Sequence, residues 1–361
     1  MEISSVWKRI QRSLFPRIEH CLGALTGEHK RVISILEVVR VEEQIRQPRS
    51  WTGRPPHDWI PIARAFVAKP VLKQDSTRDL IKRLQADASL RQILGWQEEE
   101  RLPHESVFSR VFDQLAQTEI PGRTHEAMIN QFVKDPGICQ SAIDSSAIKA
   151  REKAHNTRKS VEVKVRRKRG RPKKGEERGD PEPSGVAQYL PMKPSRMKRT
   201  LPRLCSWGGK KNSQGAVEYW KGYKFHVSVA EDGLPIACLL TSASVHDSQA
   251  APFLLKKTAR KVQGYCLADS AYDAAPIRTL SSRLGLLPII DSNPRRGEKR
   301  PMEPDRARRY KSRTQVERFF ARLKDEFGGR MIFVRGDRKV YAHLMFGVLA
   351  LLADQLLRSV Q

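Results

Sequence analysis

Cysteines are few in this sequence, and no long hydrophobic run is free of polar residues. The five cysteines are scattered without a Cys-x-x-Cys pair, and the nine histidines show no ligand spacing with them. This pattern fits neither a zinc site nor a disulfide framework and favours a reducing cytosol. The first fifteen residues carry three cations and no apolar core, so we expect no signal peptide. The most apolar stretch, 340–357, is interrupted by polar residues and predicts a buried closing helix rather than a membrane span.

Negative charge is also in short supply. The chain has 67 Lys and Arg against 40 Asp and Glu, a net charge of +27, which indicates a polyanionic partner. Residues 1–140 hold 21 cations and 18 acids, so 24 of the net positive charges lie in residues 141–361. A charge that served solubility alone would be spread more evenly. The length of 361 residues is enough for two domains and a sizeable core.

One segment near the C-terminus combines opposite charges on one face. Residues 310–324 contain no Pro or Gly and are predicted to form a helix. At 100° per residue, Tyr310, Arg313 and Lys324 project within roughly 40° of Glu317. Such a stripe suits a ligand that is both polyanionic and metal-bound, which indicates a nucleic-acid phosphate. The alternative is a surface helix with i,i+4 ion pairs, and the stripe alone favours neither.

Two aspartates follow short apolar runs elsewhere in the chain. Asp144 lies in the run 143–147 and Asp269 in 267–272, each followed by small residues. An Asp at the end of a buried strand presents its carboxylate at the open edge of a sheet, where open α/β sheets place their chemistry. Together with Glu317, the two aspartates can hold two divalent cations about 4 Å apart for an in-line phosphoryl displacement. A single strand-end Asp is more often a helix cap or a turn residue.

These residues resemble those of a known family. Tyr310, Arg313, Glu317 and Lys324 reproduce the Y-(2)-R-(3)-E-(6)-K signature of bacterial insertion-sequence DDE transposases. The sequence Asp-Ser-Ala-Tyr from position 269 is similar to the family's second-aspartate motif, and Ile-Asp-Ser-Ser from position 143 is similar to its first. The likeness extends from about residue 55 to the C-terminus. It implies an α/β fold with a ribonuclease-H-like catalytic core, and two Mg²⁺ ions, with Mn²⁺ able to substitute, on the catalytic residues Asp144, Asp269 and Glu317.

The resemblance also implies a reaction and its partners. The enzyme would nick DNA at the ends of an insertion sequence, and the freed 3′-OH would then attack target DNA. Tyr310, Arg313 and Lys324 would hold the terminal phosphates. We expect DNA partners (terminal inverted repeats and target), a homodimer in the DNA complex, and a bacterial, nucleoid-associated cytoplasmic location without a membrane. Two alternatives stay open: a non-catalytic DNA-binding protein derived from a transposase, and a structure-specific nuclease.

The periodicities divide the chain into two regions. Residues 1–135 are predicted to be helical and could bind DNA through a helix-turn-helix-like unit or mediate dimerisation, and the pattern favours neither. Residues 136–361 are predicted to form the DDE catalytic domain, a mixed sheet flanked by helices. Its expected elements are strands at 138–148, 223–229, 234–242 and 286–290, a strand ending at Asp269, and helices at 248–262, 274–284 and 310–324.

A strongly basic insertion interrupts the predicted catalytic domain at about 149–215. Residues 151–211 hold 20 cations and 6 acids and are expected to form a loop that becomes ordered mainly on contact with nucleic acid. Within it, Arg169, Arg171, Lys173 and Lys174 belong to an Arg-Gly-Arg-Pro-Lys-Lys run that matches an AT-hook core. Such a run fits a narrow A·T minor groove, and the alternative is a basic loop that touches phosphates.

Two further pairs of residues leave their roles open. Asp247 precedes a predicted helix and is expected to act as its N-cap, while His246 and Asp247 could also support the site. Trp207 and Trp220 lie near several lysines and either stack on unpaired bases or pack on the sheet, and packing is the commoner role.

Overall fold

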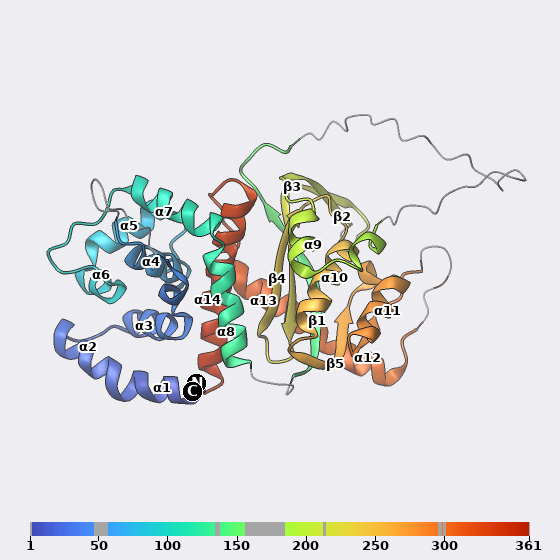
Figure 1. Cartoon of the computed structure of the whole chain (residues 1–361), viewed down its shortest axis with the longest axis horizontal. Helices are drawn as coiled ribbons and strands as arrows, with labels where there is room; N and C mark the ends of the chain where they lie inside the picture. The colour runs from blue at the N-terminus through green and yellow to red at the C-terminus, as the bar shows by residue number, and fades with distance from the viewer. Residues whose placement is uncertain are drawn as a thin grey trace, which may run out of the picture.

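A mixed sheet flanked by helices follows a helical N-terminal region along the chain (Figure 1). The computed structural model describes residues 2–46, 57–133, 138–155, 185–211, 214–294, 298 and 301–360. The N-terminal helices are α1 (Ile3–Arg9), which continues through a π-helical turn (Ile10–Leu14) into α2 (Phe15–Leu22), then α3 (Gly27–Val39), α4 (Trp59–Val71), α5 (Thr77–Ala86), α6 (Ala88–Leu94), α7 (Glu105–Gln117) and α8 (Ile120–Phe132).

Local capping explains where several of these helices begin. The Ser76 hydroxyl accepts the backbone N–H of Asp79 and starts α5, as its sequence predicts. The Asp87 carboxylate accepts the N–H of Leu90 and starts α6 directly after α5. Apolar positions at helical spacing, such as Val32 and Ile35 of α3, are buried.

The sheet has six strands: β1 (Ile138–Lys149), β2 (Ser206–Lys211), β3 (Val217–Ala230), β4 (Pro235–Ser242), β5 (Val262–Ala268) and β6 (Leu286–Ile290). Its order is β2-β3-β1-β5-β6, with β4 also paired to β3. β3 runs antiparallel to β1, β2 and β4, whereas β5 is parallel to β1 and β6. A short turn joins β3 to β4, which cover the strands predicted at 223–229 and 234–242, and the predicted strand at 286–290 has the bounds of β6.

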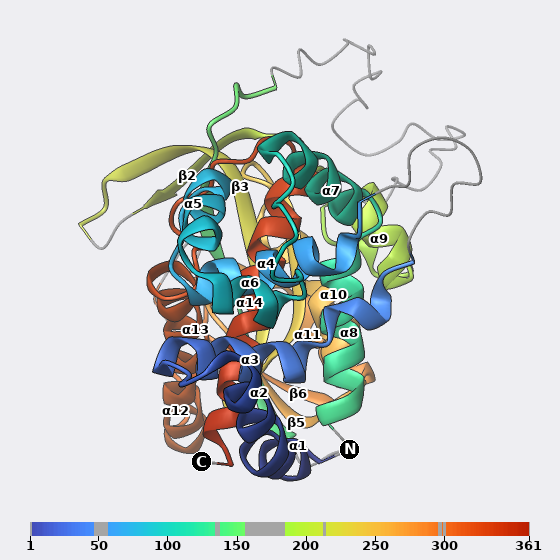
Figure 2. The same cartoon turned by 90° about the vertical axis from the view of Figure 1, so that its left-hand side faces the viewer.

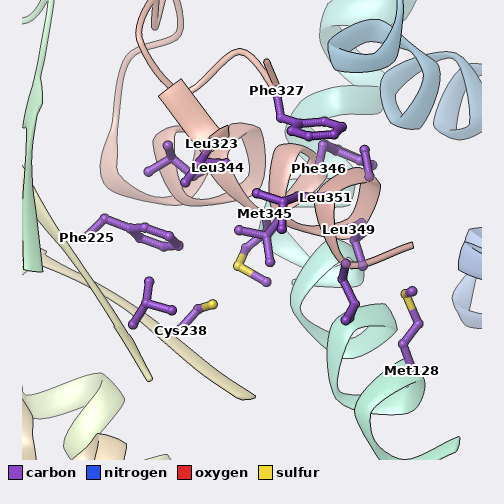
Figure 3. Close-up of a cluster of buried hydrophobic side chains, with 14 of the residues drawn as sticks. Met128, Phe225, Cys238, Leu323, Phe327, Leu344, Met345, Phe346, Leu349 and Leu351 are labelled. Atoms are coloured by element: carbon purple, nitrogen blue, oxygen red, sulfur yellow. The ribbon is translucent and has the colours of Figure 1, made fainter. Parts of the chain in front are cut away.

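Helices cover both faces of this sheet. α10 (Asp247–Thr258) packs on the face that carries Ser228, whose hydroxyl accepts a hydrogen bond of 2.7 Å from Thr258. α13 (Thr314–Asp325) and α14 (Asp337–Arg358) lie on the opposite face, against Phe225 (Figure 3). The smaller helices are α9 (Pro194–Thr200), α11 (Ala275–Arg283) and α12 (Pro304–Tyr310), with short 3₁₀ turns at Val41–Gln44, Ala187–Tyr189, Ser270–Tyr272 and Lys311–Arg313.

α14 joins the helical region to the sheet. Figure 3 shows Met345 of this helix near Phe225 and Cys238 of the sheet, while Met128 of α8 lies on its other side. By length and composition, α14 could cross a membrane, but 89% of its apolar window is buried within the protein. Each large apolar side chain fully buried in this way contributes about 1.5–3 kcal/mol relative to exposure. The prediction of a buried closing helix is therefore confirmed.

Three predicted elements differ from the structure. The basic insertion is not a loop throughout, because α9 and β2 form within residues 194–211 and β2 pairs with β3. The helix expected at 248–262 ends at Thr258, since Val262 already begins β5. The helix expected at 310–324 is interrupted: Tyr310 ends α12, Lys311–Arg313 form a 3₁₀ turn, and α13 begins at Thr314. Sequence periodicity misses this break because the backbone stays in the right-handed helical region throughout.

Candidate functional site

Asp144 and Asp269 meet where the parallel ladder between β1 and β5 ends. The last paired residues of that ladder are Ile143 and Ala268. Asp144 and Asp269 follow them directly in the sequence. β1 itself continues to Lys149 as the antiparallel partner of β3, so Asp144 lies within its strand and not at the strand end that the sequence suggests. The two carboxylates therefore come together at the end of the β1–β5 ladder, and not at the ends of two strands.

Burial and mutual repulsion act on these two acids. Burial and the charge of Asp269 raise the pKa of Asp144 to about 6, against the opposing effects of the Ser145 N–H and the Arg313 guanidinium. Burial also raises the pKa of Asp269, whose carboxylate accepts the backbone N–H of Ala271 at 3.0 Å. Asp269 therefore caps the 3₁₀ turn that follows β5 and also faces Asp144. Two carboxylates with raised pKa values at one edge have a high affinity for added positive charge.

Arg313 connects the third acid to this pair. Its Nη1 lies 2.9 Å from Asp144 Oδ2, and its Nη2 lies 2.5 Å from Glu317 Oε1. The Glu317 side chain is 54% exposed at the start of α13. Among the described residues, no three acidic, histidine or cysteine side chains are arranged so that they could already hold a metal ion. A guanidinium thus bridges two of the three carboxylates that the sequence assigns to a metal.

The surroundings nevertheless suit a hydrated divalent cation. The donors are carboxylate oxygens, which Mg²⁺ prefers. Tyr272 is fully buried, and the pKa of its phenol is raised by burial and then by the charges of Asp247, Asp144 and Asp269. Its hydroxyl has no hydrogen-bond partner within the part of the chain that the structure describes. A buried, unpaired hydroxyl beside several carboxylates is ordinarily costly and marks a place for a polar ligand or water.

The other residues of the predicted helix stripe also reach this edge. Lys324 Nζ donates to the Ser146 hydroxyl at 2.6 Å, and Ser146 shares its face of β1 with Asp144 because side chains repeat every second residue. The Arg313 guanidinium carbon lies 5.8 Å from the centre of the Tyr310 ring. Tyr310, Arg313 and Lys324 therefore gather around Asp144 despite the break between α12 and α13.

Asp247 has a different role from the expected cap. The ring Nδ1 of His246 accepts the N–H of Ser248 at 3.3 Å, so His246 is the N-cap of α10. The Asp247 carboxylate turns inward and accepts hydrogen bonds from Ser145 Oγ at 2.9 Å and Lys224 Nζ at 3.0 Å. A histidine at the preceding position leaves Asp247 free to point into the protein, which capping preferences alone do not reveal.

Sequence reasoning missed Lys224, Ser145 and Tyr272 as neighbours of the site. The signal for Lys224 was the alternation along 223–229, which places Lys224 and His226 on the face opposite Phe225. The nearby His226 and Lys224 hold the pKa of Asp247 below its ordinary value despite burial. Because burial lowers the pKa of His226 itself to about 4, Lys224 is the cation that pairs with Asp247 at neutral pH. The ion pair between Lys224 and Asp247 thus holds Ser145, whose backbone N–H donates to Asp144 at 2.7 Å.

The other predicted DNA contacts divide into two groups. Arg169, Arg171, Lys173 and Lys174 lie outside the described residues. Of the two tryptophans, Trp220 is buried and donates its Nε1 hydrogen to the Tyr223 carbonyl at 3.1 Å, whereas Trp207 is 61% exposed.

Comparison with known families agrees with this geometry. A family described as the transposase DDE domain matches residues 135–353, and a second transposase domain matches residues 24–114. These two matches indicate a transposase, a class of protein that acts on DNA. The first match spans more than half of the chain, and this protein belongs to the transposase DDE domain family. No curated protein and no solved structure matches the chain significantly.

Proposed function

We propose that this protein is a transposase that cleaves DNA at the ends of an insertion sequence and joins the 3′-OH ends to target DNA. The observation that carries the proposal is the meeting of Asp144, Asp269 and Glu317 around Arg313, beside the cations that phosphates require. We further propose that the sheet is a ribonuclease-H-like core and that the chain acts as a homodimer on DNA.

Asp144, Asp269 and Glu317 would hold two Mg²⁺ ions, which supply charge stabilisation for the phosphoryl transfer when bound. The chain's own cations then have separate tasks. Arg313 would no longer be needed to balance the charge of Asp144 and Glu317 once bound cations do so. Its planar guanidinium could then contact a phosphate at two points. Lys324, on the same face and held at Ser146, can reach a neighbouring phosphate.

Lys224 and Asp247 support this arrangement from the other face of the sheet. Because Asp247 accepts from Ser145, it holds the segment whose N–H donates to Asp144. Asp144 is thereby fixed from below by a backbone donor and from above by Arg313. Fixed ligands lose little conformational entropy when charge develops at the site, which favours catalysis by preorganisation.

The test uses the full-length protein, a donor plasmid carrying the gene with its flanking DNA, and a target plasmid. With Mg²⁺, we expect new junctions between donor ends and target, detected by sequencing. Asp144→Asn, Asp269→Asn and Glu317→Gln should each lower the yield by about a thousandfold or more while DNA binding persists, and the combined variant should be hardly worse than each single one.

A matched control is present on the same helix. Asp325 is also 54% exposed, but its ion-pair partner is Arg330 and not Arg313. Asp325→Asn should therefore leave junction formation intact. Hydrolysed ends without junctions would instead favour a structure-specific nuclease, and binding without any cleavage would favour a non-catalytic DNA-binding protein.

A further inference from the structure

The hairpin formed by β2 and the first half of β3 has an exposed aromatic face. In its register, Trp207 lies opposite Lys221 and Gly209 lies opposite Tyr219. Residues directly opposite each other share a face of an antiparallel pair, as do residues two apart along a strand. Trp207 is 61% exposed, Tyr219 is 73% exposed, and both lie on this face. Figure 2 shows the hairpin extending away from the body of the molecule.

The two faces of the hairpin have different tasks. Trp220 is on the other face and anchors the hairpin, since it is buried and bonded to the Tyr223 carbonyl. Gly208 makes this possible, because a Cβ there would lie 2.7 Å from the Trp220 ring. On the exposed face, the Tyr219 ring lies over Gly209, where an added Cβ would be 3.1 Å from it. Trp207 and Tyr219 thus flank a glycine on the exposed face.

The register of β3 connects the exposed face of the hairpin to Asp144. Further along β3, Phe225 lies opposite Ser146 and Val227 lies opposite Asp144. Because side chains alternate along a strand, Tyr219 lies on the same face of β3 as these residues, and Lys221 lies opposite Trp207 on that face. A strand of DNA held at Asp269 and Lys324 would accordingly continue along the hairpin.

We propose that the Trp207–Tyr219 face of the hairpin is a stacking platform for unpaired bases of DNA that is bound at Asp144 and Asp269. This inference rests on the proposed function, because it takes DNA as the ligand of that site. Aromatic rings flanked by lysines bind single strands by stacking on bases, and the lysines follow the phosphates. Paired bases in a duplex present no free π-face, so the platform binds DNA whose bases are unpaired.

The test compares two single-stranded probes of equal length, an oligothymidylate and an abasic strand with the same number of phosphates. Binding is measured without divalent metal by fluorescence anisotropy. The unmutated protein should bind the oligothymidylate more tightly than the abasic strand. The variant with Trp207→Ala and Tyr219→Ala should lose about tenfold or more in affinity for the oligothymidylate and nothing for the abasic strand. The single variant Trp207→Phe, which keeps Tyr219 and an aromatic ring at position 207, should retain part of the affinity that the double variant loses.

Leu287→Ala is the matched control, since Leu287 is an apolar residue with 55% exposure on β6. It should change neither affinity. Equal binding of the two probes by the unmutated protein, or an equal loss for both probes in the double variant, would overturn the proposal. A double variant that binds normally but changes from dimer to monomer in sedimentation velocity would show that the face contacts a second copy instead. Because these measurements need no cleavage, they are separate from the junction assay that tests the proposed function.

Discussion

The two ends of helix α13 differ in the balance between carboxylates and arginines. Near its C-terminal end, Arg322 joins Arg31 and Arg358 around one acid, Asp354, at N–O distances of 2.5, 3.2 and 2.8 Å respectively. At its start, the single Arg313 is shared between Asp144 and Glu317, and Asp269 stands close by. The first arrangement surrounds a buried acid with cations of the protein itself, and Arg322 also pairs with Glu326. The second leaves an excess of negative charge, which suits a site that takes up cations from outside.

The largest effect on stability should come from the Asp354 cluster. Asp354→Ala leaves three arginines without their shared partner, whose side chain is 11% exposed. Removing one partner of a buried ion pair costs about 3–5 kcal/mol, and we expect about 2–3 kcal/mol here because Arg31 and Arg358 are solvent-exposed and Arg322 keeps Glu326. Urea unfolding should report that loss. Asp113→Ala is the control, because its ion pair with Lys339 is exposed and should contribute at most about 1 kcal/mol. Equal losses in both variants would erase the contrast between the ends of α13.

The next effect concerns the reaction and not the fold. Lys324→Ala removes a half-buried cation beside Ser146 and should slow single-turnover cleavage of an end fragment at saturating Mg²⁺ by about 10- to 100-fold, from the loss of one charge-assisted contact worth about 1.5–3 kcal/mol. Arg313→Ala should lose as much or more, because it contacts Asp144 and can grip a phosphate at two points. Unchanged cleavage and joining in both variants would remove them from the site.

A smaller effect concerns Asp144, whose ionisation should lower the free energy of unfolding instead of raising it. The folded protein binds the Asp144 proton more tightly than the unfolded chain, since the pKa is raised to about 6 from 3.8. Stability therefore declines as the pH rises from about 4 to 6, and the penalty is complete above that. Asp144→Asn should relieve it, raising the metal-free stability at pH 8 by roughly 1–2 kcal/mol and by nothing at pH 4. A destabilised variant at pH 8 would contradict this assignment.

Asp247 should affect the free energy of unfolding in the opposite direction to Asp144, and its effect should be the smallest. Its pKa is held below the ordinary value by His226 and Lys224 despite burial. Its contribution to stability is therefore present above pH 4 and is lost as the pH falls through the lowered folded-state pKa. Asp247→Asn should cost about 1 kcal/mol at pH 8, because an amide oxygen still accepts from Ser145 while the ion pair with Lys224 is lost. Thermal melts over pH 2–8 should show both trends: the deficit of Asp247→Asn should shrink as the pH falls below 4, and the gain of Asp144→Asn should grow between pH 4 and 6.

Much of the catalytic half could be predicted from the sequence, because its signals are local. Alternation of apolar residues located β3, β4 and β6, and a short turn at 231–233 joined the hairpin. Spacing along 310–324 put four residues on one side, and Arg313 and Lys324 still both contact β1 although the short 3₁₀ turn lies between Tyr310 and Thr314. Elements that depend on distant partners were missed. β2 has a weak apolar pattern of its own and forms by pairing with β3.

The amino-acid sequence by itself determined the residue types and spacings that identify the family, the excess of positive charge in residues 141–361, and the course of most strands. Tertiary structure decided how these residues meet. It placed Asp144 at the end of a ladder and not of a strand, turned Asp247 inward to Lys224, and separated a buried Trp220 from an exposed Trp207. The reason is physical: spacing along a chain fixes which side of an element a residue occupies, but the burial and the charges around it depend on segments a hundred or more residues away.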